Sequence, residues 1–196
     1  MFKIKKIVSL VAICVVFMTI GTSALAVSYV PNSSEPKESS IASENTIILN
    51  DSALIEKSEK MFPDSVKPEA IGVTLKNKKL VGQFYYGDNP FLVDSVKGPM
   101  ATGPKIVFEE TASGGVNSEY GVGAGDIETS FGIDINYEET VTRTYQFDPI
   151  PKNKFLTYMA YVNYSVYEFD IYSWGSYVGE GTYWIPVGIV IEHDLT

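Results

Sequence analysis

The chain has 196 residues, with 15 basic and 24 acidic side chains and one histidine. This acidic balance disfavours binding to nucleic acids and to anionic lipid heads, because like charges repel. Arg143 is the only arginine, so the sequence offers no anion site built from several arginines.

The first 26 residues have the pattern of a cleavable secretory signal peptide. Three lysines lie among the first six residues, an apolar run follows over residues 7–20, and Ala24-Leu25-Ala26 supplies the small residues that signal peptidase reads. The run is shorter than the about 20 apolar residues of a membrane anchor. We expect cleavage after Ala26 and a secreted, extracellular protein with 12 basic and 24 acidic side chains.

Cys14 is the only cysteine of the chain. A lipoprotein signal needs a small residue before its cysteine, whereas Ile13 stands there and the apolar run continues beyond Cys14. The cysteine is therefore expected to leave with the signal peptide. A mature chain without cysteine excludes disulfides, cysteine-ligated zinc and thiol chemistry.

Residues 27–50 are rich in serine, glutamate, asparagine and proline, which predicts a disordered leader. Residues 51–67 predict a short helix and a linker. Asn50 or Asp51 can cap this helix and Pro63 follows its end. The side chains expected on its apolar face are Leu54, Ile55, Ser58, Met61 and Phe62.

The remaining chain, residues 68–196, predicts one β domain. Residues 71–75 and 80–86 are expected to form a strand pair around the lysine-rich residues 76–79. A turn cluster at 87–90 separates them from short strands over 91–96 and 105–111.

Residues 127–147 alternate with a period of two. Eight of the eleven odd-numbered positions are apolar, and none of the ten even-numbered positions is. A helix would scatter these residues around its circumference, so the pattern predicts extended chain with one apolar face. We expect either one long bent strand or two strands that meet near residues 137–139.

The C-terminal residues predict the centre of the sheet. Residues 155–172 carry aromatic and β-branched side chains on both faces, which is typical of a strand covered on both sides. A turn at 173–176 is expected to lead into strands over 177–185 and 187–191. The predicted fold class is all-β, an antiparallel β-sandwich or an elongated β-sheet.

Little in the sequence predicts catalysis. His193, the sole histidine, lies near the end of the chain and is expected to be exposed, and no G-x-S-x-G motif occurs, so we assign no catalytic residue. Several acidic pairs occur, for which a solvated strand face is the favoured interpretation. They are Glu109-Glu110, Asp126 with Glu128, Glu138-Glu139, and Glu168 with Asp170.

No cofactor is expected, except that calcium is a weak candidate at Asp126 and Glu128, whose oxygens follow a glycine-rich stretch. The 13 tyrosines and two tryptophans are expected to pack mainly inside strands. Trp174, at a predicted turn, and Tyr177 are the candidates for contact with a ligand.

Several short motifs after Gly114 resemble an uncharacterised group of secreted β-proteins from Gram-positive bacteria. They are Ser130-Phe131-Gly132-Ile133, Thr140-Val141-Thr142-Arg143-Thr144-Tyr145, Ile150-Pro151-Lys152-Asn153-Lys154, Gly179-Glu180-Gly181-Thr182 and Pro186-Val187-Gly188-Ile189. This resemblance brings no known activity with it.

The alternating, threonine-rich segment and the proline–lysine connection after it also resemble, remotely, the membrane-inserting module of aerolysin and epsilon-toxin-type pore formers. That resemblance implies oligomerisation and a β-barrel built from residues 114–147, with Phe131, Ile133 and Ile135 in the membrane hairpin. Glu139 and Arg143 interrupt the same face, and a lipid-facing barrel wall tolerates such charges badly.

The favoured function is that of a secreted, non-enzymatic protein that binds a protein or glycan, or has a structural role, at or outside the cell surface. A pore-forming membrane-active protein is the second hypothesis, and only this one involves a membrane. A secreted glycan hydrolase that uses paired carboxylates is the third.

Overall fold

The computed structural model describes residues 37–38, 44–60, 73–118 and 120–196. The expected signal peptide lies outside these ranges. Within them the chain forms, in order, β1 (Lys37–Glu38), β2 (Thr46–Asn50), α1 (Ser52–Lys60), β3 (Val73–Tyr85), β4 (Leu92–Lys97), β5 (Lys105–Ala112), β6 (Gly115–Ser118), α2 (Ala124–Phe131), β7 (Glu139–Gln146), β8 (Phe155–Ser173) and β9 (Ser176–Leu195).

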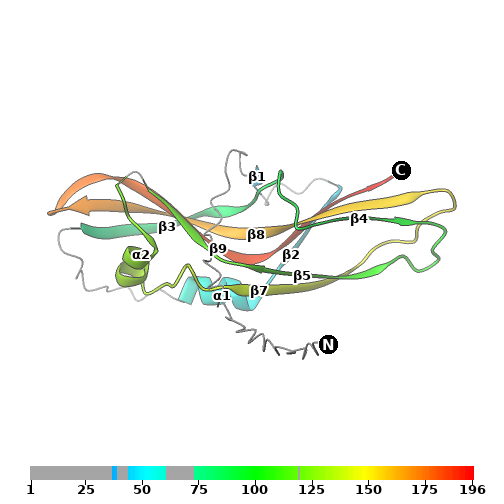
Figure 1. Ribbon diagram of the computed structural model, residues 1–196, viewed down its shortest axis with the longest axis horizontal. Helices are drawn as coiled ribbons and strands as arrows, with labels where there is room; N and C mark the ends of the chain where they lie inside the picture. Colours follow the sequence, from blue (N-terminus) through cyan, green and yellow to red (C-terminus); the bar gives the residue numbers. More distant parts are fainter. Residues whose placement is uncertain (1–36, 39–43, 61–72, 119) are drawn as a thin grey trace, which may run out of the picture.

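The spine of the molecule is the long hairpin of β8 and β9, which runs through the elongated structure (Figure 1). Trp174 and Gly175 form its two-residue turn with φ angles of 49° and 82°. Positive φ at both positions gives the turn a twist that matches the strands beside it. The strand predicted over 155–172 is therefore confirmed, whereas the two predicted strands after it are one continuous strand, β9.

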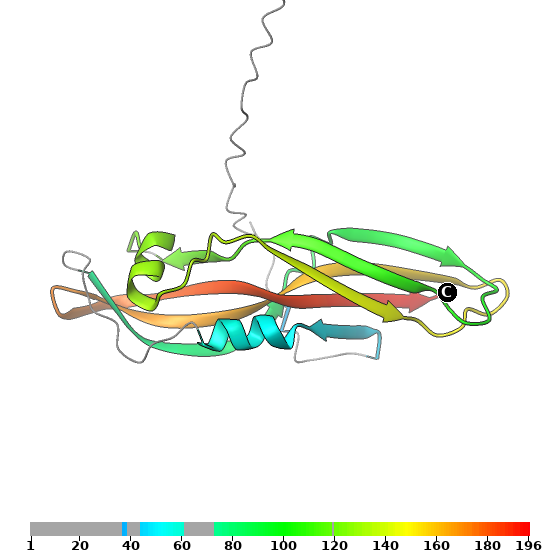
Figure 2. The same ribbon diagram turned by 90° about the horizontal axis from the view of Figure 1, so that it is seen from below.

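All other strands are placed relative to this hairpin. In the larger sheet β3 and β4 pair with β8, while β2 and β6 pair with β9, and every pairing is antiparallel. A second sheet consists of β5 and β7. It lies along the half of the spine that ends at the C-terminus, and α2 lies beside the other half (Figure 2). The prediction of an all-β, antiparallel, sandwich-like fold is confirmed.

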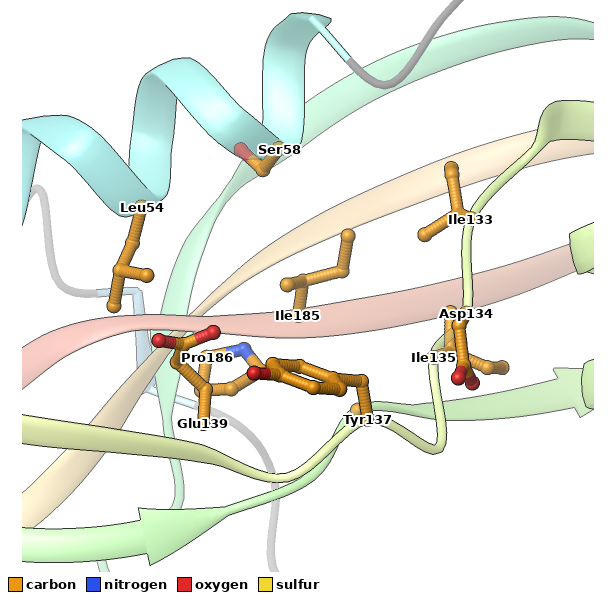
Figure 3. Close-up of a pocket in the computed structure, with 10 residues that line it drawn as sticks. Leu54, Ser58, Ile133, Asp134, Ile135, Tyr137, Glu139, Ile185 and Pro186 are labelled. Carbon is orange, nitrogen blue, oxygen red and sulfur yellow. The ribbon is translucent and has the colours of Figure 1, made fainter.

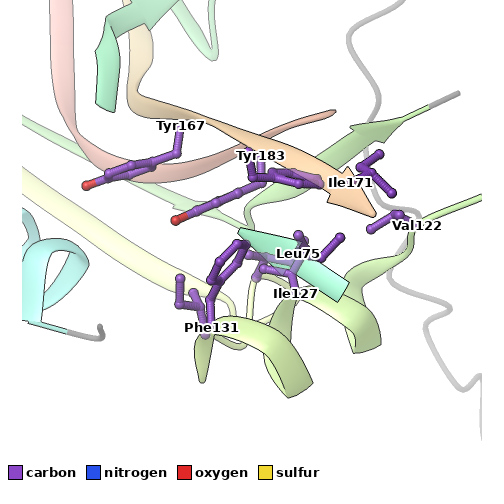
Figure 4. Close-up of a cluster of buried hydrophobic side chains, with 10 residues drawn as sticks. Leu75, Val122, Ile127, Phe131, Tyr167, Ile171 and Tyr183 are labelled. Atoms are coloured by element: carbon purple, nitrogen blue, oxygen red, sulfur yellow. The ribbon is translucent and has the colours of Figure 1, made fainter. Parts of the chain in front are cut away.

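The two faces of β8 carry separate cores. Where the pairing of β8 with β3 and β9 is irregular, the additional residue of each bulge belongs to β3 or β9 and not to β8. The side chains of β8 therefore alternate between its two faces along the whole strand. Even-numbered residues, such as Tyr158, pack in a cluster with Phe108 and Val141 of the β5–β7 sheet. Odd-numbered residues, such as Phe169, pack in a cluster beneath α2, which also contains Tyr183 of β9 (Figure 4).

Helix α2 corrects the prediction for residues 127–147. Residues 127–131 are helical, residues 132–138 form no strand, and only residues 139–146 are extended, as β7. The Asp126 carboxylate accepts a hydrogen bond from the Gly123 amide at 2.7 Å. Gly132, at φ 69°, ends the helix by donating its amide to the Glu128 carbonyl. Local capping and tertiary packing therefore outweigh the period-two pattern here.

Two further predictions are corrected. The expected strand pair over 71–86 is a single strand, β3, whose register shifts near residues 76–79 and 80–82 accommodate extra residues as bulges. The expected leader is not wholly disordered, because residues 46–50 form β2 on the outer edge of β9. The predicted strands over 91–96 and 105–111 are confirmed as β4 and β5.

Helix α1 confirms the prediction of a helix after Asp51. The Asp51 carboxylate accepts hydrogen bonds from the amides of Ala53 (2.9 Å) and Leu54 (3.2 Å), and its other oxygen pairs with the guanidinium of Arg143. One face of the helix packs inward, with Leu54 against the β5–β7 core and the Ser58 hydroxyl 3.1 Å from that of Tyr167. The expected face residues 61 and 62 lie outside the described ranges. Neither described helix is long and apolar enough to cross a bilayer.

Substitution of Asp51 is expected to separate its two roles. Asp51→Ala removes the cap and the ion pair, and should lower the free energy of unfolding by about 1–2 kcal/mol. Asp51→Ser keeps a capping oxygen and loses only the ion pair, so its loss should be about 0.5 kcal/mol. Urea denaturation at neutral pH measures both. Equal losses would contradict the capping role.

The same carboxylate predicts a pH dependence. Burial raises the pKa of Asp51, but hydrogen bonds from Arg143 and from the two helix amides outweigh it, so its pKa lies below the ordinary value of 3.8. A lowered pKa means that the contribution to stability is present above 3.8 and is lost as the pH falls through the folded-state pKa. The difference between wild type and Asp51→Ala should therefore shrink in acid.

Candidate functional site

The sequence-predicted ligand contacts lie at the free tip of the β8–β9 hairpin. Trp174 is 83% exposed and Tyr177 is 54% exposed. The Tyr177 hydroxyl donates to the Glu180 carboxylate at 3.2 Å, and its ring packs edge-on against Tyr172. These side chains are accessible, but neither lines any of the larger hollows of the described chain. The tip is an exposed contact point and not a formed site.

The candidate calcium ligands lie in α2. Asp126 uses a carboxylate oxygen to cap the helix, and Glu128 is exposed one half-turn later. Among the described residues, no three carboxylate, histidine or cysteine side chains lie close enough together to hold a metal ion. A local structural role thus accounts for Asp126.

The candidate membrane-hairpin residues are part of the core. Phe131, Ile133 and Ile135 are at most 7% exposed. Ile133 and Ile135 also border a small cavity of about 30 Å³ between α1, β9 and the segment that leads into β7 (Figure 3). A space of this size holds about one water molecule and cannot hold an organic ligand.

The remaining candidates are dispersed. His193 was expected at a frayed, exposed end, but it lies half-buried in β9, opposite Tyr158, with its ring 5.7 Å from that of Phe147. Asp170 accepts a hydrogen bond from Asn77 of β3, and Glu168 is exposed beside it. The sequence pairs therefore do not form an acid–base site around the histidine.

A larger groove of about 400 Å³ lies on the face of the spine that the β5–β7 sheet covers. The pairing of that sheet ends at Ala112 and Glu139, and the groove opens where this cover ends. We call it the aromatic groove after four of its lining residues: Tyr86, Phe91, Tyr164 and Trp184. Strands β8 and β9 supply Tyr164 and Trp184, and the connection between β3 and β4 supplies Tyr86 and Phe91.

The aromatic side chains of the groove are held by local packing. The rings of Tyr86 and Tyr164 meet edge-on, with centroids 6.3 Å apart. Trp184 is only 6% exposed, because its indole lies against Gly115 of β6, where an added Cβ would come within 2.3 Å of the ring. Burial raises the pKa of the Tyr86 hydroxyl, which keeps this phenol protonated and able to donate.

The opposite wall of the aromatic groove is acidic. Glu110, near the end of β5, and Glu138, just before β7, both line it. Glu110 is half-buried, and this burial raises the pKa of its carboxyl above the ordinary value. Asn89 adds an amide on the other side. No lysine, arginine or histidine is among the described lining residues.

The sequence brought out only part of this groove. Glu110 and Glu138 belonged to acidic pairs noted for their spacing, but nothing indicated that the chain brings them to one wall. The sequence predicts only that most tyrosines and tryptophans pack inside strands, and it does not single out Tyr164 or Trp184. The available signal was Tyr86, which directly precedes the turn residues 87–90 and therefore ends a strand at a surface.

The sequence matches no protein-family model and no curated protein. The chemistry of the aromatic groove is therefore the basis for a function. Ring faces can stack on the apolar faces of a ligand, while carboxylates and an amide accept or donate hydrogen bonds at its edges. Its volume falls in the range of small-molecule sites.

Proposed function

We propose that this protein is a secreted, non-enzymatic binding protein that acts at or outside the cell surface, and that it binds a saccharide in the aromatic groove. The observation that carries the proposal is that aromatic residues and two glutamates line one opening of about 400 Å³. Sugars present apolar C–H faces and polar hydroxyl edges, which match ring faces and carboxylate oxygens respectively. The signal-peptide pattern of residues 1–26 supports secretion.

The arrangement of the carboxylates favours binding over hydrolysis. Glycosidases place two carboxyl groups on either side of the scissile bond. Glu110 lies in β5 and Glu138 directly precedes β7, so both come from the β5–β7 side of the groove, whereas the aromatic residues and Asn89 come from the spine and the β3–β4 connection. This geometry supplies hydrogen-bond acceptors along one edge of a ligand without a second carboxylate on the opposite side.

Calorimetric titration with a panel of cello-, xylo-, chito- and glucosamine oligosaccharides tests the proposal. At least one should bind, and Tyr164→Ala should weaken that binding roughly ten-fold, because it removes a stacking surface. Trp174→Ala is the matched control, since this exposed aromatic lies at the hairpin tip, and it should bind as wild type does. Thermal unfolding of both variants checks that each is folded.

Failure of every oligosaccharide to bind would overturn the saccharide proposal. Loss of binding in Trp174→Ala, with Tyr164→Ala unaffected, would move the site to the tip. Release of new reducing ends during incubation would instead favour the glycan hydrolase.

A membrane-active, pore-forming function is the second candidate, and one observation favours it. The segment between β5 and β7 leaves their sheet and returns to it at directly opposed residues, Ala112 and Glu139, so its two ends lie side by side as in a hairpin insertion. To leave the spine, this insertion would have to break the pairing of β6 with β9. The insertion carries the first part of the period-two pattern, residues 127–138, with the buried residues Ile127 and Phe131.

A disulfide that ties the insertion to the spine tests this candidate. Asn117 of β6 lies opposite Thr182 of β9, so Asn117→Cys with Thr182→Cys places two thiols on neighbouring strands of a mature chain expected to lack other cysteines. A pore former should release dye from liposomes only when this disulfide is reduced. Intact liposomes with the reduced protein and with wild type would remove the candidate.

A further inference from the structure

The charge of the aromatic groove narrows the ligand class. Glu110 and Glu138 stand on its wall, and its described lining has no basic side chain to neutralise them. Anionic saccharides, such as uronic acid, sulfated or phosphorylated glycans, would meet like charge there. A ligand with a positive group would instead be attracted by these two carboxylates.

The aromatic residues favour the same kind of ligand. A cation over the face of a tyrosine, phenylalanine or tryptophan ring is attracted by the ring quadrupole, and the attraction grows when water is excluded. The groove combines such rings with the half-buried Glu110. A ligand with a cationic group and an apolar face fits this arrangement, because the carboxylate attracts the cation and the rings contact the apolar face.

We infer that the aromatic groove selects saccharides that carry free amino groups, such as oligomers of unacetylated glucosamine, with one ammonium group held at Glu110 and another at Glu138. This inference rests on the proposed function, since it names the class of saccharide that the groove takes. The sugar rings then stack on the aromatic side, where Tyr164 and Tyr86 lie. N-acetylation removes the positive charge of the amino group, so N-acetylglucosamine cannot make the ionic interaction with these carboxylates that glucosamine makes.

Burial at Glu110 couples binding of an amino sugar to the release of a proton. Because its surroundings disfavour the ionised form and raise its pKa, the unliganded carboxylate holds a proton to a higher pH than an exposed glutamate. A bound ammonium group favours the ionised form instead. Binding of the amino sugar should therefore release a proton from Glu110 when the pH is close to the pKa of that carboxyl.

The test compares the glucosamine tetramer with the N-acetylglucosamine tetramer by calorimetry, at a pH at which the amines are protonated. The unacetylated tetramer should bind roughly ten-fold more tightly, and its affinity should fall as salt is added. Glu110→Gln combined with Glu138→Gln should abolish this preference. Glu109→Gln is the matched control: Glu109 is the neighbouring residue on the opposite, exposed face of β5, and its substitution should leave the preference unchanged.

Equal affinity for the two tetramers, or a preference for the acetylated one, would overturn the inference and leave the saccharide proposal standing. A preference that survives in the double glutamine variant would also overturn it. If neither tetramer binds, the inference fails, and the other members of the oligosaccharide panel decide whether the proposed function fails with it.

Discussion

Replacing Phe131 with alanine is expected to lower the free energy of unfolding by about 3–5 kcal/mol. Phe131 is 7% exposed, and its ring packs against those of Phe169 and Tyr183, with centroids 5.9 and 6.1 Å away. Truncation leaves a cavity between α2 and the spine that the rigid sheet cannot close. For a protein of this size the midpoint of thermal unfolding should fall by roughly 10 °C.

Trp174→Ala is the control for this prediction. It removes a larger aromatic side chain that is 83% exposed at the hairpin tip, and should change stability by less than about 0.5 kcal/mol. Urea denaturation followed by circular dichroism measures both variants. A loss below 1 kcal/mol for Phe131→Ala would contradict the packing of α2 on the sheet, and would favour an insertion that is only loosely attached.

The same residue explains why the extended conformation predicted for residues 127–131 is wrong, whereas that predicted for residues 139–146 is confirmed. Ile127 and Phe131 are four positions apart, and this spacing puts two side chains on one face of a strand and also on one face of a helix. Over so short a stretch the period-two pattern cannot separate the alternatives. Gly123 with Asp126 at the start, and Gly132 at the end, are the helix signals that decide it.

The period-two pattern predicts the structure correctly where a neighbouring strand pairs with the segment. Val141 points into the core and its neighbours point outward in β7, because this strand is paired over its full length with β5. The central position of β8 was equally predictable, since its apolar side chains occupy both faces. Fold class and the central strand thus follow from local composition, which needs no knowledge of long-range contacts.

The aromatic groove could not be predicted in this way. It combines side chains from β8 and β9, from the β3–β4 connection, from β5 and from the residue just before β7. Which of these meet depends on where the pairing of β5 and β7 ends, at Ala112 and Glu139. The sequence offered a break near residues 137–139 as one of two alternatives, but its spacing does not indicate that Ala112 is the residue opposite that break.

The second large effect is expected at Asn163, which is fully buried in β8. Its side-chain amide donates to the Asn50 side chain of β2 at 2.7 Å, and Asn50 in turn donates to Gln83 of β3 at 2.8 Å. β2 and β3 lie on opposite edges of the β8–β9 hairpin, so these amides close the curled sheet across its inner face. Gly188 permits the approach, since an added Cβ would come within 2.8 Å of Asn50.

Asn163→Leu should lower the free energy of unfolding by about 1–3 kcal/mol, because the buried position loses the hydrogen bonds that the Asn163 amide donates to the side-chain oxygens of Asn50 and Gln83. Asn163→Asp should cost more at neutral pH, since the new carboxylate faces two amide oxygens in a buried position. Urea denaturation of both variants at neutral pH measures these losses. Wild-type stability in Asn163→Leu would show that the amides do not hold the sheet closed.

Acid should rescue the aspartate variant specifically. Burial raises the pKa of that carboxyl, so its contribution to stability is present below the unfolded-state pKa of about 3.9 and is lost as the pH rises through the folded-state value. The protonated group can also donate to Asn50, as the native amide does. Relative to wild type, Asn163→Asp should therefore gain stability between neutral pH and about pH 4, whereas Asn163→Leu should not. A gap that stays constant over this range would mean that water reaches the site and the sheet is open there.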